Sequence, residues 1–204
     1  MSECRVKVTD PLVVAVCAYR GPALGVGEAF ERVQSWADVH HFEQWGPLIG
    51  VYSDAAVGAA ADVAVDAAAG AAVDAAAGAA DHGAAVEAAA AAAVGVGSVD
   101  VSAEAWLPLP PGASAPTAAD PAIQVRALDP ECVASCVHRG FPDGVGEVLA
   151  GLLAWVEEQG LTRATATHRQ VYLQAPKGRP GDWEIEIQVP VAPRTSEPRP
   201  PEPR

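Results

Sequence analysis

The chain has 204 residues, half of them apolar, so it is long enough for one or two small domains with a hydrophobic core. Its 13 basic and 26 acidic side chains give a net charge of −13, which argues against binding to a phosphate backbone. The sequence shows neither a secretory leader nor a membrane-spanning segment, and we therefore expect a soluble, cytoplasmic protein.

The first half of the chain predicts a strand, a helix and two further strands. Residues 12–19 are rich in β-forming side chains and lead into an Arg-Gly turn. Apolar side chains then recur at three- and four-residue spacing, which predicts a helix with one buried face: Val26, Phe30, Val33 and Trp36. Two strands are expected at 48–54 and at 100–109.

A low-complexity insert, residues 55–98, separates these two strands. It consists almost entirely of Ala, Gly, Val and Asp, and the octet at 65–72 is repeated identically at 73–80. Alanine favours a helix, whereas the glycines disfavour one and large anchoring side chains are scarce. We expect a marginal helix or disorder in the insert, and a mobile Pro- and charge-rich tail at 193–204.

The second half predicts the same order of elements. A strand is expected at 132–138, and two more at 165–174 and 183–189. Between the first two of these strands lies a second helical pattern, which ends before Gly160: Val145, Leu149, Leu152 and Val156.

The two halves also match residue by residue. Segments 17–21 and 25–28 align with 136–140 and 144–147 at an offset of 119, and 51–52 aligns with 171–172 at an offset of 120. We interpret the chain as a tandem duplication of a strand-helix-strand-strand unit, with the insert carried by the first copy.

Metal and cofactor sites are not predicted. The four cysteines form no recognisable disulfide scaffold and are expected to be reduced, and Cys132 and Cys136 lack a second ligand pair at zinc-finger spacing. His40 and His41 are adjacent, so they cannot share a helix face. The sequence also lacks a P-loop, a dinucleotide fingerprint and a Gly-x-Ser-x-Gly motif.

Several motifs resemble the GyrI-like, or AraC-type effector-binding, domain family. They are Tyr19-Arg-Gly-Pro22, Glu28-Ala-Phe30 with Trp36, the segment 46–54, Arg169-Gln-Val-Tyr-Leu173 and Trp183-Glu-Ile-Glu-Ile-Gln-Val-Pro190. The last motif is the most specific and is similar to the family's W-x-T-E-I-Q-x-P strand, with Ile185 in place of threonine. The resemblance covers residues 10–192.

This resemblance implies a single α+β domain over residues 1–192. Its two repeats, about 10–110 and 128–191, would each be an SHS2-like unit, and together they would form a pseudo-twofold, barrel-like body around a central ligand cleft.

The last predicted strand places two carboxylates on one face. Glu184 and Glu186 alternate with apolar residues, and a hairpin with the preceding strand would put Tyr172 beside one of them. The pattern alone is typical of the solvated side of an antiparallel sheet. The resemblance implies instead that Glu186 and Tyr172 line the effector pocket.

The alignment of the halves extends this predicted site into the first repeat. Trp106 aligns with Glu186, Glu104 with Glu184, and Tyr52 with Tyr172, so all six are expected to face the same cleft. The two glutamates Glu104 and Glu184 are assigned to its rim. Trp45 and Trp183 are expected either to close the pocket mouth or to shield a hairpin.

Two function classes follow from these residues. The first is a drug- or xenobiotic-binding protein that holds planar, lipophilic or cationic ligands between aromatic walls and a carboxylate. The alternative is a hydrolase, because some GyrI-like proteins open the cyclopropane of DNA-alkylating natural products, a detoxification or self-resistance activity. In that case Glu186 would be the acid/base, with a raised pKa, and Tyr172 a second proton donor. A protein partner, such as the DNA gyrase of the family name, ranks below both, and neither nucleic acid nor membrane is an expected partner.

Overall fold

The protein is described here from a computed structural model, which covers residues 3–22, 25–53, 100–116, 120–141, 144–174 and 183–193. The expectations for the insert 55–98 and for the tail beyond residue 193 lie outside the described residues. In chain order the elements are β1 (Arg5–Val8), β2 (Leu12–Pro22), α1 (Val26–Val39), β3 (Ile49–Ser53), β4 (Asp100–Leu109), β5 (Ile123–Leu128), β6 (Cys132–Gly140), α5 (Val145–Glu158), β7 (Leu161–Arg163), β8 (Thr167–Gln174) and β9 (Trp183–Pro193).

The strands form one antiparallel sheet, in which the spatial order of the strands differs from their order in the chain. With the two helices, the fold is α+β. The order across the sheet is β1-β6-β9-β8-β3-β4-β2-β5, and β7 pairs with the end of β9. Strands β8 and β3 meet at the centre, whereas β1 and β5 are the two edges. The sheet is therefore open among the described strands, unlike the barrel-like body that the resemblance implied.

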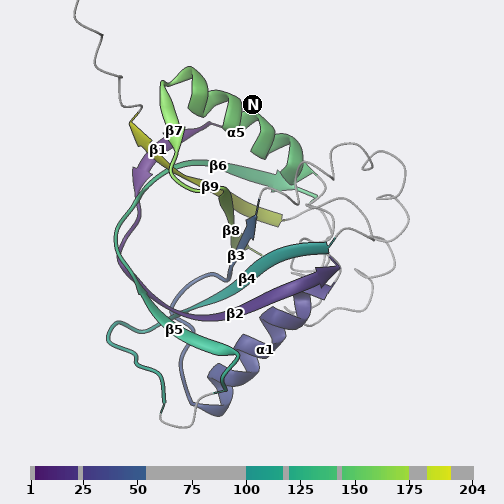
Figure 1. The fold of residues 1–204 in the computed structure, drawn as a ribbon, viewed down its shortest axis with the longest axis vertical. Coiled ribbons are helices and arrows are strands. Elements are labelled where there is room, and N and C mark those ends of the chain that lie inside the picture. The colour runs from purple at the N-terminus through teal and green to yellow at the C-terminus, as the bar shows by residue number, and fades with distance from the viewer. Residues whose placement is uncertain are drawn as a thin grey trace, which may run out of the picture.

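Both helices pack against the same side of this sheet. In Figure 1, α5 lies along β6 at one end of the molecule and α1 lies along β2 at the other. One continuous apolar core joins residues from both helices to alternate residues of the strands, among them Phe30, Leu152 and Ile187. The helical positions predicted from the sequence are confirmed as buried in both helices.

The predicted strands are confirmed, and the described residues contain three further strands. Strands β1 and β5 precede the two predicted units, and β7 follows α5. Strand β1 pairs with β6 in the second half of the chain, and β5 pairs with β2 in the first half. Each half therefore contributes an edge strand that is hydrogen-bonded to the other half.

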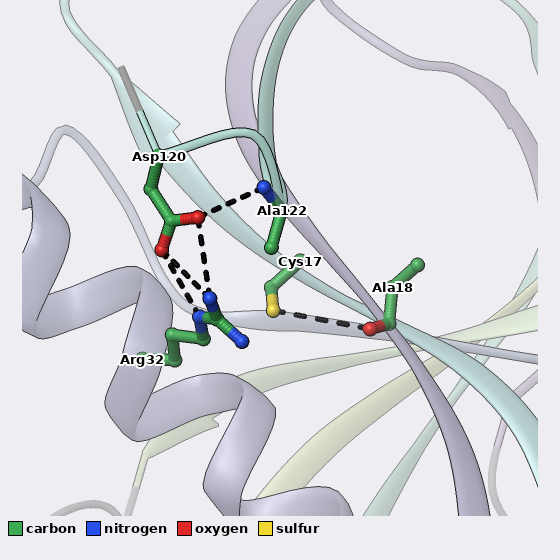
Figure 2. Close-up of polar contacts among 5 residues, drawn as sticks. All are labelled: Cys17, Ala18, Arg32, Asp120 and Ala122. Carbon is green, nitrogen blue, oxygen red and sulfur yellow. Dashed lines mark hydrogen bonds and ion pairs between the residues drawn. The ribbon is translucent and has the colours of Figure 1, made fainter. Parts of the chain in front are cut away.

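A bidentate ion pair fastens α1 to the segment that enters β5. The Arg32 guanidinium lies 2.8 Å from the Asp120 carboxylate, and that carboxylate also accepts a hydrogen bond from the Ala122 backbone N–H (Figure 2). The hydrogen bond from the Ala122 backbone N–H, followed by those from Arg32, lowers the pKa of Asp120.

Candidate functional site

The candidate site lies on the sheet face opposite the two helices, which we call the open face. Side chains alternate between faces along a strand, and directly paired residues of neighbouring strands share a face. A second apolar cluster lies on the open face, separate from the helix-covered core: Val14, Val16, Ile49, Val51, Trp106 and Val171. Two glutamates, Glu104 and Glu186, flank it.

Glu186 is buried, with 5% of its surface exposed, and is ion-paired. The Lys7 ammonium of β1 lies 2.6 Å from one carboxylate oxygen and 2.8 Å from the other. The Gln188 side-chain amide donates to the same carboxylate at 3.0 Å. Burial by itself raises the pKa of Glu186, but the hydrogen bonds from Lys7, Gln188 and Ser135, with the Lys7 charge, outweigh it and lower the pKa. The raised pKa expected from the sequence is therefore wrong.

Glu104 has a corresponding set of contacts in the other half. The Arg126 guanidinium of β5 lies 3.1 Å from its carboxylate, and the Trp106 indole N–H donates to it at 2.8 Å. Above the Trp106 ring lies the Arg169 guanidinium, 4.9 Å from the ring centroid, and Arg169 is also ion-paired with Glu131. The indole is thus held by a carboxylate at its edge and a planar cation at its face.

The strand register shows that the predicted alignment of β4 with β9 is wrong by two residues. Glu186 pairs with Val171 and Val137, and Glu104 pairs with Val51 and Ala18. These neighbours are themselves separated by 120 and 119 residues, the offsets of the sequence repeat. Glu104 therefore corresponds to Glu186, and Trp106 corresponds to Gln188, which occupies the same hydrogen-bonding place.

The two tyrosines lie on the helix-covered face, so they do not meet Glu186. Tyr172 pairs with Ile185 rather than with Glu186, and Tyr52 pairs with Ala103. Their hydroxyl groups are hydrogen-bonded to each other at 2.8 Å within the core. Burial raises the pKa of both phenols. The prediction that Tyr172 shares a face with Glu186 is wrong, because a shift of one residue in register moves a side chain to the other face.

A pocket of about 320 Å³ opens on the open face between β4 and β8. Its lining combines an acid, an aromatic ring, a cation and hydroxyl groups: Glu104, Trp106, Arg169, Ser53, Ser102, Thr165 and Thr167, with Val51, Ala103 and Pro190. Glu186 is not part of this lining. It shares a row across the sheet with Trp106, three strands away, which at about 4.8 Å per strand is about 14 Å.

The remaining predicted residues are dispersed. Glu184 does not line the pocket and is ion-paired with Arg139 at 2.7 Å. Trp183 is buried in the helix-covered core against Tyr172, with their ring centroids 6.2 Å apart. Trp45 is 58% exposed and does not line the pocket. Of the eight residues predicted for the cleft, Glu104 and Trp106 are the two that line this pocket.

Three basic residues of the open face were not predicted from the sequence: Lys7, Arg126 and Arg169. Lys7 and Arg126 are themselves 119 residues apart, so the repeat offset could have revealed them. Arg169 falls within the motif that carries the family resemblance, but it has no basic counterpart at Ile49.

Residues 2–192 match the GyrI-like small molecule binding domain. The chain belongs to this family. No curated protein sequence is significantly similar to it. Solved structures share its fold, although none of those described next exceeds 12% sequence identity.

The C-terminal domain of EcmrR is 12% identical, with a TM-score of 0.62 over 95% of this chain and 99% of that one. A hydrolase from Listeria innocua is 12% identical, with a TM-score of 0.52 over 93% of this chain and 92% of that one. SAV2435, solved bound to tetraphenylphosphonium, is 10% identical, with a TM-score of 0.51 over 93% of this chain and 94% of that one. At these identities the comparisons establish the fold.

Neither a membrane-spanning helix nor a metal-binding cluster is present in the described part of the chain. It contains no helix long and apolar enough to cross a membrane. Within the same residues, no group of three or more His, Cys, Asp or Glu side chains is placed to hold a metal ion.

Proposed function

We propose that this GyrI-like domain binds lipophilic cations that carry flat aromatic rings in the open-face pocket, with Trp106 as the stacking surface and Glu104 as the counter-ion. The observation that carries this proposal is the Arg169 guanidinium, which lies over the Trp106 ring at 4.9 Å. The protein thus already presents one planar cation to that ring, and a ligand cation would take its place. The pocket volume of about 320 Å³ lies at the lower end of the range for small-molecule sites.

Glu186 has a supporting role in this proposal. Its carboxylate is neutralised by Lys7, and about 14 Å of sheet separates it from Trp106. A ligand long enough to cross the apolar strip between them, formed by Val171 and Ile49, would reach both glutamates. We further propose that the halves 10–110 and 128–191 are SHS2-like repeats of a duplicated unit, which accounts for a glutamate on each side of the strip.

Hydrolysis of electrophilic cyclopropanes is less well supported by the geometry. The lowered pKa of Glu186 keeps this carboxylate ionised near neutral pH, so it is a poor general acid. The proposed second proton donor, Tyr172, lies on the other face of the sheet. A hydrolase from Listeria innocua has the same fold, so the experiments below also test for hydrolysis.

Isothermal titration calorimetry with tetraphenylphosphonium tests the binding proposal. Saturable binding is expected for the wild type, and Trp106→Leu should weaken it about tenfold, the effect of losing a desolvated cation–π contact of about 1–2 kcal/mol. Trp45→Leu is the matched control, because Trp45 is exposed and outside the pocket lining, and should change the affinity less than about twofold. The proposal fails if the wild type does not bind, or if both variants bind equally well.

The Arg169→Gln variant separates a binding role from a structural one. Removing the guanidinium uncovers the Trp106 ring, so the affinity for the cation should rise rather than fall. An unchanged or weaker affinity would contradict the proposal that the Arg169 guanidinium occupies the place of the ligand cation over the Trp106 ring. The mass of a cyclopropane-bearing duocarmycin-type compound after incubation gives the remaining outcome: an added water would indicate the hydrolase, and an unchanged mass with quenched tryptophan fluorescence would indicate the binder.

A further inference from the structure

A pair of thiols connects the N-terminal edge strand to the body of the sheet. The Sγ atoms of Cys4 and Cys136 are 2.9 Å apart, although the residues are separated by 132 positions in the sequence. A disulfide bond is about 2.05 Å long, so the two sulfurs need to approach by about 0.9 Å to form one. None of the four cysteines, all of which are described, forms a disulfide in this structure.

The strand register creates this contact. Arg5 of β1 pairs with Ser135 of β6, which places the preceding residue, Cys4, opposite Cys136. The corresponding pair in the other half is Cys17 of β2 with Ile123 of β5. Cys17 therefore faces a side chain without a thiol, and its own thiol donates a hydrogen bond to the Ala18 carbonyl at 3.9 Å (Figure 2).

The two thiols differ in their access to solvent. Cys136 is buried, with 3% of its surface exposed, whereas Cys4 is half-buried and lies just before the first strand. Burial, with a hydrogen bond to Cys136, raises the pKa of Cys4 to about 12, so the thiol form dominates near neutral pH and exchange is slow. An oxidant from solution would reach Cys4 first, and Cys136 is then in place to resolve the product.

We propose that Cys4 and Cys136 form a reversible dithiol–disulfide pair that clamps β1 onto β6. The oxidant is a low-molecular-weight disulfide such as oxidised glutathione. The Cys4 thiolate attacks one sulfur of this disulfide, releasing one glutathione thiolate, and Cys136 then attacks the Cys4 sulfur of the mixed disulfide, releasing the second. The two protons lost by the cysteines end on the two released glutathiones, so one disulfide is reduced as another forms.

The clamp matters because β1 carries Lys7, the counter-ion of Glu186. Strand β1 has four residues, three of them exposed, and it is hydrogen-bonded to β6 alone. Such an edge strand opens more readily than the central strands. A covalent link three residues before Lys7 keeps the ammonium beside Glu186 when the hydrogen bonds of β1 open.

The full-length protein, incubated with oxidised and then with reduced glutathione, provides the test. After oxidation, titratable thiols in denaturant should fall from four to two, and peptide mapping should find Cys4 linked to Cys136. Amide hydrogen exchange in β1 should slow at least about tenfold, because opening of the strand is now restrained. Reduced glutathione should reverse both changes. Cys4→Ser should abolish them, and Cys132→Ser, which removes a thiol from the same strand as Cys136, should preserve them.

Each other result overturns the proposal. Retention of four thiols by the folded wild type would show that the pair does not close. A link that involves Cys17, Cys132 or a second molecule would show that the geometry does not select this pair. A Cys4–Cys136 bond without slower exchange in β1 would show that the bond does not act as a clamp. These readouts need no ligand, so they are independent of the proposed binding function.

Discussion

At the scale of single residues, the buried carboxylate of Glu186 depends on one ammonium from a distant part of the sequence. Lys7 supplies the charge, while Gln188 and Ser135 occupy further lone pairs with hydrogen bonds. Burial of a carboxylate without such partners is costly, and the group then takes up a proton instead. The charge of Glu186 is thus maintained by β1, an edge strand.

Replacement of Lys7 by Met should show this dependence. We expect the free energy of unfolding at pH 7 to fall by about 2 kcal/mol, less than for a fully buried pair because 31% of the Lys7 side chain is exposed. The lowered pKa of Glu186 means that its contribution is present above the ordinary value of 4.5 and is lost as the pH falls below it. In Lys7→Met, burial dominates and raises the pKa above 4.5, so the sign reverses: the contribution of Glu186 to stability is present below pH 4.5 and is lost as the pH rises.

Urea unfolding of the wild type and variant from pH 3 to 8 measures both effects. The double variant Lys7→Met, Glu186→Gln is the control, because it removes the charge that the single variant leaves unpaired. It should recover part of the lost stability and abolish the pH dependence of this pair. Equal pH profiles for the wild type and Lys7→Met would contradict the assigned ion pair.

At the scale of elements, the central strand β3 has a glycine where its neighbour needs space. A Cβ atom added to Gly50 would lie 2.6 Å from ring and hydroxyl atoms of Tyr52, two residues further on the same face. The Tyr52 hydroxyl is itself fixed by its hydrogen bond to Tyr172. The ring therefore covers the glycine and has little freedom to move away.

Gly50→Ala should lower the free energy of unfolding by about 2 kcal/mol, the usual cost of overpacking a tight core. Gly151→Ala is the matched control in the interior of α5, where an added Cβ meets nothing within 4 Å. It should raise the stability by about 0.5–1 kcal/mol, since alanine has the higher helix propensity. Urea unfolding at pH 7 compares them, and equal effects of the two substitutions would argue against the packing described for Tyr52.

The helices and strands could be predicted from the sequence where their apolar residues recur at regular spacing. Both helices bury the faces that the three- and four-residue spacing indicated. The register of β8 with β9 was not predictable, because an irregularity between Tyr172 and Gln174 shifts the pairing of the two strands. That error assigned Tyr172 and Tyr52 to the wrong face, whereas Glu104 and Trp106 were correctly placed together.

The cations of the open face were missed for a different reason. Lys7 lies in a strand of four residues, too short for a periodic signal, and its partner Glu186 is in the other half of the chain. Nothing in the sequence of either strand specifies that contact. It follows from the pairing of β1 with β6 rather than with the strand that comes next in the sequence.

At the scale of the whole molecule, the two halves are joined by an exchange of edge strands. Strand β1 completes the second half and β5 completes the first, while β3 pairs with β8 at the centre of the sheet. Each exchanged edge strand also carries the cation of one glutamate: Lys7 of β1 neutralises Glu186, and Arg126 of β5 neutralises Glu104. A half folded by itself would have an unpaired strand edge and would lack the other half of the shared core. Its glutamate would also lack the cation that neutralises it.

Cleavage of the chain between the halves should therefore give two fragments that fold only together. Ser114 and Ala115 are exposed and lie outside any strand, so fragments 1–114 and 115–204 keep every described element intact. Each fragment alone should give a poorly dispersed amide NMR spectrum, and an equimolar mixture should give a dispersed one and the mass of a one-to-one complex by light scattering. Lys7→Met in the first fragment should weaken the complex by about tenfold or more, because it leaves Glu186 of the second fragment buried and unpaired. A dispersed spectrum from either fragment as a monomer would show instead that each half is a self-sufficient unit and that the exchanged strands are dispensable.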